Sequence, residues 1–190
     1  MPLVHCIVNP ASRDFTCGKN WPSIEQKMKD AGLEVKAYIT ERVGHGAEIS
    51  NSIRHQWEES GVGGESDGKP PVVVAVGGDG IAHEVASGLR GSELILAQLP
   101  HGSGNDYAIT HGIPRTNIDG AINIIAHGVD RKCGAWRLEG HPCREEGGYP
   151  APQANPWDGE PENDDTVVRW VFLETDAGIT SDISLSLIHI

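Results

Sequence analysis

The chain has 190 residues, 38% of them hydrophobic, which suffices for one α/β domain plus part of a second and argues against a disordered protein. The formal net charge is −12 at pH 7 with no basic run, so we expect neither nucleic-acid binding nor tight electrostatic docking on anionic membranes. The first residues lack a signal-peptide pattern, and no apolar stretch reaches the ~20 residues of a membrane helix. We therefore expect a cytoplasmic protein that makes at most transient contact with membranes.

The first third of the chain alternates predicted strands and helices. The first strand is a short, mostly apolar run, and the helices show apolar residues at helical spacing, the first of them ended by Gly32. In chain order the expected elements are strand Leu3–Val8, a helix through Trp21–Ala31, strand Glu34–Ile39, helix Ala47–Glu59 and a glycine-rich surface loop at Gly61–Lys69.

The same alternation continues to about residue 130. Val72–Val76 is apolar throughout, as a parallel strand covered on both faces should be. The elements that follow are a helix over Ala82–Leu89, strand Leu94–Leu99, a glycine-rich loop at His101–Asp106 and a helix over Ile118–Ile125. Strands that alternate with helices in this way predict an α/β fold with a doubly wound, mostly parallel sheet.

After residue 130 the pattern changes. Strands are predicted at Arg131–Glu139, Thr166–Thr175 and Ile183–Ile190 with no helix between them, so antiparallel β-structure begins here. The segment of about 140–165 is polar and rich in Pro, Gly and acidic residues, which predicts a disordered insertion. We expect an α/β domain over 1–130 and a partial β domain over 131–190 that is incomplete or truncated.

The passage Gly77-Gly78-Asp79-Gly80 joins the strand at Val72–Val76 to the next helix. Its glycines let the backbone approach a ligand closely, and free N–H groups at a helix start favour phosphate. The passage is neither a Walker motif nor G-x-G-x-x-G. The alternative interpretation is a glycine-rich turn in which Asp79 caps the helix.

Polar or glycine-rich residues follow the other strands as well. Gly102 and Gly104 allow tight turns in the loop after the fourth strand, where Ser103 and Asn105 offer side-chain donors. Asn9-Pro-Ala-Ser12 and Thr40-Glu41 follow the first and second strands, and each alone could be a plain turn. Because strand ends of a parallel sheet meet at one edge, the four segments together predict a nucleotide site.

The motifs N-P-A-S, T-E-x-x-G-H, G-G-D-G and G-S-G-N-D occur in the order found in the diacylglycerol kinase catalytic domain family, which includes sphingosine and ceramide kinases. The resemblance covers about residues 3–130. It implies an α/β nucleotide domain followed by a β-sandwich domain, with ATP and Mg²⁺ as cofactors and a lipid with a free hydroxyl (diacylglycerol or a sphingoid base) as acceptor. The nucleotide-binding residues it implies are Asn9, Ser12, Thr40, Gly77, Gly78, Asp79, Gly80, Glu84, Ser103, Gly104, Asn105 and Asp106.

The chain departs from the family pattern at three motif positions. Ile81 replaces a threonine beside the phosphates, His83 replaces an asparagine, and Arg13 stands where glycine is common. No second G-D-G follows residue 131, so the general base is expected to be missing and no catalytic residue is assigned. Two alternatives stay open: an inactive nucleotide-binding or regulatory module, and a metabolite kinase of the NAD kinase type. The nine histidines show no metal-ligand spacing, and no protein-only metal site is expected.

Overall fold

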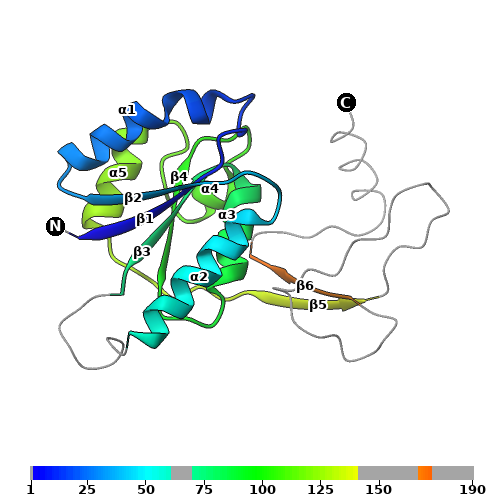
Figure 1. The fold of residues 1–190 in the computed structure, drawn as a ribbon. Helices are drawn as coiled ribbons and strands as arrows, with labels where there is room; N and C mark the ends of the chain where they lie inside the picture. Colours follow the sequence, from blue (N-terminus) through cyan, green and yellow to red (C-terminus); the bar gives the residue numbers. More distant parts are fainter. Residues whose placement is uncertain (1, 61–69, 141–166, 173–190) are drawn as a thin grey trace.

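The computed structural model describes residues 2–60, 70–140 and 167–172. Its centre is a four-stranded parallel sheet in the order β2-β1-β3-β4 (Figure 1). The strands are β1 (Leu3–Val8), β2 (Glu34–Ile39), β3 (Val72–Gly77) and β4 (Ile95–Pro100). All four strands lie within one residue of their predicted bounds. β1, β3 and β4 are compact apolar runs between turn residues, whereas β2 carries Glu34 and Lys36.

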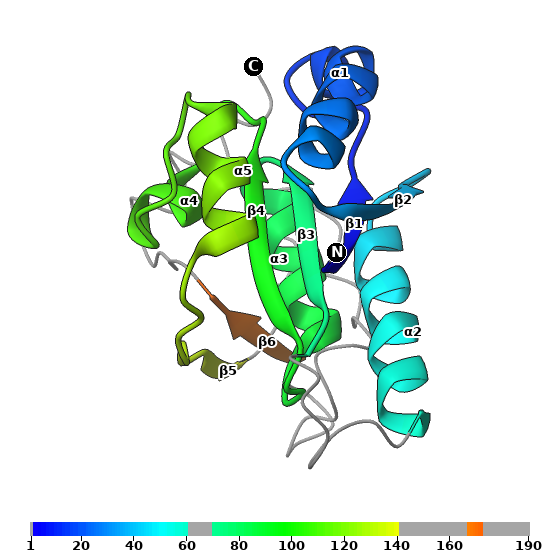
Figure 2. The same cartoon turned by 90° about the vertical axis from the view of Figure 1, so that its left-hand side faces the viewer.

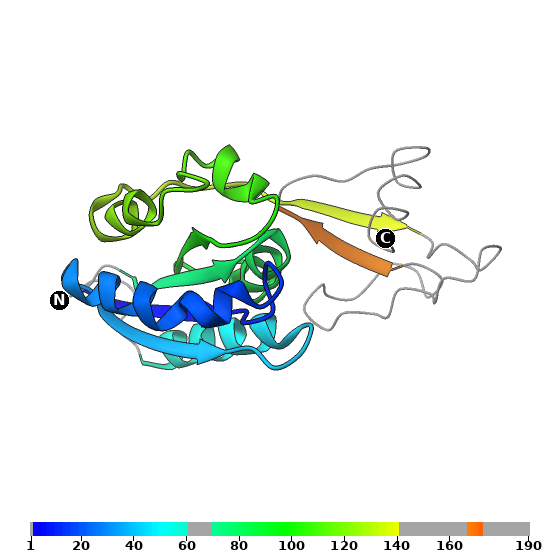
Figure 3. The ribbon, with the colours of Figure 1, turned by 90° about the horizontal axis from the view of Figure 1, so that it is seen from above.

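Helices cover both faces of this sheet, so the predicted doubly wound α/β fold is confirmed (Figures 2 and 3). α1 (Thr16–Asp30) and α5 (Ile118–His127) pack on one face, and α2 (His45–Glu59) and α3 (Asp79–Leu89) pack on the other. A hydrophobic core lies on each face of the sheet, and alternate residues of β3 belong to each: Val74 and Val76 face α1, while Val73 and Ala75 face α3. Burial on both faces explains why this strand is apolar throughout.

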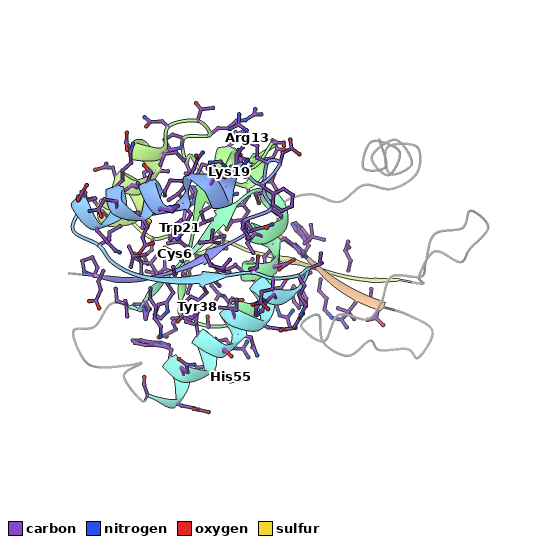
Figure 4. The ribbon with its side chains drawn as sticks, turned by 45° about the horizontal axis from the view of Figure 1, so that its top comes forward. Cys6, Arg13, Lys19, Trp21, Tyr38 and His55 are labelled. Carbon is purple, nitrogen blue, oxygen red and sulfur yellow. The ribbon has the colours of Figure 1, made fainter. Side chains whose placement is uncertain are left out.

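The side chains labelled in Figure 4 show the two layers of the core. Cys6 and Trp21 lie between the sheet and α1, whereas Tyr38 lies on the side of α2. Cys6 is fully buried and unpaired, as expected for a reduced core thiol, and burial raises its pKa to about 12. The thiol therefore stays protonated at neutral pH and acts as a small apolar group.

Two strands beyond residue 131 form a separate antiparallel pair, β5 (Trp136–Gly140) with β6 (Val167–Val171), which is shorter than predicted. β6 lies against α3: the Arg90 guanidinium is 4.5 Å from the centre of the Trp170 ring, and Phe172 meets His83 edge-on. The predicted loop at 61–69, the insertion and the strand at 183–190 lie outside the described residues, and the domain division at residue 130 stays a prediction. Among the described helices, none is long and apolar enough to cross a membrane.

Candidate nucleotide site

The candidate site lies at the edge of the sheet where all four parallel strands end. Val8 pairs with both Ile39 and Val76, and Val76 pairs with Leu99, so the four following segments begin side by side. Every predicted site residue except Glu84 belongs to a strand end, to one of these segments or to the first turn of the helix that follows. The edge therefore brings together motifs that are far apart in the sequence, as open α/β sheets do at their ligand sites.

Asp79 joins the two glycine-rich loops. Its Oδ2 accepts a hydrogen bond from the amide of Asn105 (2.8 Å), and its Oδ1 accepts one from the amide of Tyr107 (2.9 Å). These amides open α4 (Asp106–Thr110), a short helix that was not predicted. Asp79 is thus a cap, as the alternative interpretation held, but it caps a helix other than its own.

The two loops also touch through their backbones. A Cβ atom added to Gly102 would collide with the Cα of Gly78, so only glycine permits this approach. Asn105 closes the second loop: its Oδ1 accepts from the Gly102 amide (2.8 Å) and its Nδ2 donates to the Gly102 carbonyl (2.9 Å). The loops after β3 and β4 are therefore in direct contact.

At this edge of the sheet, the N-terminus of α3 has free backbone amides. Its N-cap, Gly78, supplies no side-chain hydrogen bond, and within the described residues the amides of Gly80 and Ile81 have no acceptor. A Cβ added to Gly80 would meet nothing within 4 Å, so the first turn of α3 has open space beside Gly80. Free amides at a positive helix end, next to open space, form a site for an anion such as phosphate.

The other four described helix N-termini are already occupied by groups of the protein; at α5, for example, Asn117 Oδ1 accepts from the Gly120 amide (2.9 Å). The first amides of α1 donate to carbonyls of the preceding loop, including those of Ser12 and Arg13. Glu84 accepts hydrogen bonds from the amides of Gly44 and Gly46 at the start of α2, and Asp79 accepts one from the Tyr107 amide in the first turn of α4. Among the described helices, α3 is therefore the one whose N-terminal amides lack such a partner.

The first loop, Asn9–Ser12, lies directly beside the end of β3 and Gly77. The Asn9 amide donates to the Val76 carbonyl (3.0 Å), while Asn9 Oδ1 accepts from the Ala11 amide (3.0 Å). Ser12 Oγ would lie 2.6 Å from a Cβ added to Gly77, whose φ of 148° favours glycine. Asn9 thus shapes its own loop, and the Ser12 hydroxyl lies over the Gly77 backbone.

The remaining predicted residues of this edge make fewer contacts; they are Thr40, Ser103, Gly104 and Asp106. Thr40 is buried, and its amide donates to the Val8 carbonyl (2.9 Å). Ser103 and Asp106 are exposed, and Oδ2 atoms of Asp79 and Asp106 would lie 2.9 Å and 3.0 Å from a Cβ added to Gly104. Two carboxylates therefore flank one glycine next to the open end of α3.

The structure shows the surroundings of the three residues that depart from the family motifs. Ile81 is 3% exposed and packs in the core between α2, α3 and the sheet, so its side chain faces the interior rather than the anion site. His83 is exposed and its ring meets Phe172. Arg13, Asp14 and Phe15 all have left-handed backbones, with φ of 50°, 53° and 62°, where glycine fits better than arginine.

Two residues of the site had no sequence signal. Tyr107 supplies the second amide to Asp79, and Arg115 donates from Nη2 to the Ser103 carbonyl (2.9 Å), which braces the second glycine-rich loop. Neither role could be predicted, because a backbone amide carries no residue preference and Arg115 lies 12 residues beyond its partner.

The chain matches the family model described as the diacylglycerol kinase catalytic domain over residues 4–137. A diacylglycerol kinase of Bacillus subtilis (strain 168) is 30% identical over 142 residues, which are 74% of this chain and 43% of the relative. A diacylglycerol kinase of Staphylococcus saprophyticus is 30% identical over 125 residues, 64% of this chain and 36% of the relative. A crystal structure of a diacylglycerol kinase from Bacillus anthracis str. Sterne superposes with a TM-score of 0.54 at 20% identity, covering 73% of this chain and 43% of that one.

The doubly wound sheet, with its motifs gathered at the carboxyl edge, is the α/β fold of these kinase structures. The chain belongs to the diacylglycerol kinase catalytic domain family, a family of lipid kinases that use ATP. The chain spans less than half the length of the curated relatives it matches, 43% in one case and 36% in another.

Proposed function

We propose that this chain binds ATP for an ATP-dependent lipid kinase, which transfers the γ-phosphoryl group to the free hydroxyl of diacylglycerol or a sphingoid lipid. The α/β region over residues 1–130 is the ATP-binding domain in this proposal, and the β domain begins at 131. The observation that carries the proposal is the open N-terminus of α3 between two joined glycine-rich loops. Catalysis of phosphoryl transfer depends on positioning and on neutralising charge, which these rigid loops and free amides serve.

The residues at this edge also fit Mg²⁺ bound together with ATP. Within the described residues, no group of three or more His, Cys, Asp and Glu side chains could hold a metal ion alone. Mg²⁺ takes hard oxygen ligands and usually combines one or two carboxylates with nucleotide phosphates. Asp106, with Asp79 beside it across Gly104, supplies such oxygens. The metal supplies neutralisation of phosphate charge when bound, which matters in a chain of net charge −12.

Binding of magnesium-ATP tests the proposal, with two substitutions of Gly80 that differ only in charge. Gly80→Asp places a carboxylate in front of the free amides, in a space that holds no other atom within 4 Å. We expect calorimetry to show a loss of about 100-fold or more in ATP affinity, because like charges at a binding site cost several kcal/mol. Gly80→Asn has the same shape and no charge, and we expect it to bind ATP much more tightly than Gly80→Asp.

Each variant must be as stable as the parent, and an acidic residue in the first turn of α3 should if anything stabilise the fold. Equal ATP affinity for the parent, Gly80→Asp and Gly80→Asn would show that phosphate does not bind at α3. A folded parent that binds no ATP would contradict the proposal as a whole.

The acceptor is tested separately with a chain extended to the length of the relatives. We expect transfer of labelled phosphate to diacylglycerol or a sphingoid base and none to NAD. Phosphorylation of NAD instead would establish the metabolite-kinase alternative, and ATP binding without transfer to any acceptor would establish the inactive-module alternative.

A further inference from the structure

Glu84 lies on α3 one turn beyond Gly77–Gly80, which is the phosphate loop of the proposed site. Its carboxylate faces the start of α2. Oε1 accepts a hydrogen bond from the Gly44 amide (2.9 Å), and Oε2 accepts one from the Gly46 amide (2.9 Å). Both bonds are partly buried and join residues about 40 apart in the chain. Both carboxylate oxygens are therefore engaged by the backbone of the turn that follows Thr40.

We propose that Glu84 is a positioning residue: it holds the Thr40–Gly46 turn against the phosphate loop and so sets nucleotide affinity without touching the nucleotide. This inference rests on the proposed function, since it assigns to a residue of the same site a role in ATP binding. Hydrogen bonds to a charged carboxylate are roughly twice as strong as neutral ones, and two of them fix both position and orientation.

A single core side chain connects the turn to the phosphate loop. Ile81 Cδ1 would lie 2.5 Å from a Cβ added to Gly46, and Ile81 Cγ2 would lie 2.8 Å from a Cβ added to Gly77. Glu84 Oε2 also lies beside Gly46, at 2.8 Å from the same added Cβ. Because packed interiors transmit displacement, a turn that moves away from Glu84 moves Ile81 and loosens the support of Gly77.

The carboxylate also removes a competing anion site. Without it, the amides of Gly44 and Gly46 at the positive end of α2 would be free to bind phosphate. Glu84 satisfies these amides from within the protein, which leaves α3 as the anion-binding end. Positioning of the turn and selection of the correct helix thus come from the same two hydrogen bonds.

The test compares Glu84→Gln with Glu59→Gln, an exposed glutamate at the end of α2 that gives the same change of charge. Glutamine keeps the shape of Glu84 but turns an N–H group toward a backbone amide. We expect Glu84→Gln to bind magnesium-ATP roughly 10-fold more weakly, as for the loss of one charged hydrogen bond, and Glu59→Gln to bind as the parent does. In NMR spectra without ATP, the Gly44 and Gly46 amide signals should shift in Glu84→Gln and stay in place in Glu59→Gln.

A rescue experiment separates this role from a general loss of stability. Glu84→Ala should lose ATP affinity, regain it with added acetate, and show the Gly44 and Gly46 amide signals returning; chloride at equal ionic strength should do neither. Parent-like ATP affinity in Glu84→Gln, or a loss in Glu84→Ala that acetate does not reverse, would overturn the inference while leaving the proposed function intact. No ATP binding by the folded parent would overturn both.

Discussion

The acidic side chains of this site bind mainly to backbone. Asp79 and Glu84 each use both carboxylate oxygens for main-chain amides that lie 26 to 40 residues away in the chain. Their positions in motifs marked them as site residues, but their partners could not be predicted, because only the folded topology brings these amides within reach. What the sequence does predict is the pair of glycine-rich loops, since glycine is needed wherever backbones touch, as at Gly78 and Gly102.

Arg13 carries a conformational cost that glycine would relieve. Its φ of 50° is left-handed and it is followed by two more left-handed residues. We expect Arg13→Gly to raise the free energy of unfolding by up to about 1 kcal/mol, because the strain it removes exceeds the entropy that glycine adds to the unfolded chain. Urea denaturation measures the change.

Lys19→Gly is the matched control, since it also replaces a long basic side chain with glycine, but within α1. There glycine should lower the free energy of unfolding by about 1 kcal/mol, the usual cost in a helix. If both substitutions destabilise the protein equally, the left-handed conformation of Arg13 imposes no cost.

Among the elements, the strands and long helices follow from apolar patterning, and the short helix α4 does not. α4 has five residues, too few for a periodic pattern, and its start is fixed by Asp79 on another element. β5 and β6 are shorter than the strands predicted there, because pairing in this two-stranded sheet extends over five residues of each strand. Apolar patterning therefore predicts the helices and strands that bury one face, whereas tertiary contacts determine the bounds of α4, β5 and β6.

The packing of α2 against α3 depends on Gly88. A Cβ added there would collide with Ser50 Oγ and the Ala47 carbonyl and would lie 2.9 Å from the Asn51 amide. We expect Gly88→Ala to lower the free energy of unfolding by about 1–3 kcal/mol, the usual cost of overpacking, even though alanine favours a helix. Thermal denaturation measures the change.

Gly80→Ala is the control within the same helix, because a Cβ there meets nothing within 4 Å. This variant should match or exceed the stability of the parent, since alanine has the higher helix propensity. A Gly88→Ala protein as stable as Gly80→Ala would contradict the close approach of the two helices.

At the scale of the whole molecule, stability should fall in mild acid because of a histidine inside the sheet. His5 on β1 is 8% exposed, its Nδ1 lies 3.1 Å from the Tyr38 hydroxyl, and the two rings stack at 5.9 Å. Burial, and then the charge of Lys36, lowers the pKa of His5 below 6.5. The unfolded chain therefore takes up the proton first, so this contribution is complete above the unfolded pKa and is lost as the pH falls through the folded one.

Urea denaturation between about pH 7.5 and pH 5.5 measures this effect. His5→Gln should show a shallower loss of stability toward acid than the parent, because glutamine does not titrate. Some loss should remain, since burial also lowers the pKa of His111. The exposed His127→Gln serves as control for removal of an imidazole. The same pH slope in the parent and in His5→Gln would contradict the prediction.

The shared contacts of Ile81 also limit how this sequence can evolve. Gly46, Gly77 and Ile81 fill one continuous volume, so a larger side chain at either glycine has no room while isoleucine remains. An alanine at position 46 requires loss of the Ile81 Cδ1 methyl, and a threonine at position 81 lacks that methyl but keeps the Cγ2 methyl beside Gly77, so it opens space at Gly46 alone. Positions 46 and 81 should therefore change together and in a constrained order, whereas Gly77 stays fixed by Ser12 and by its own φ.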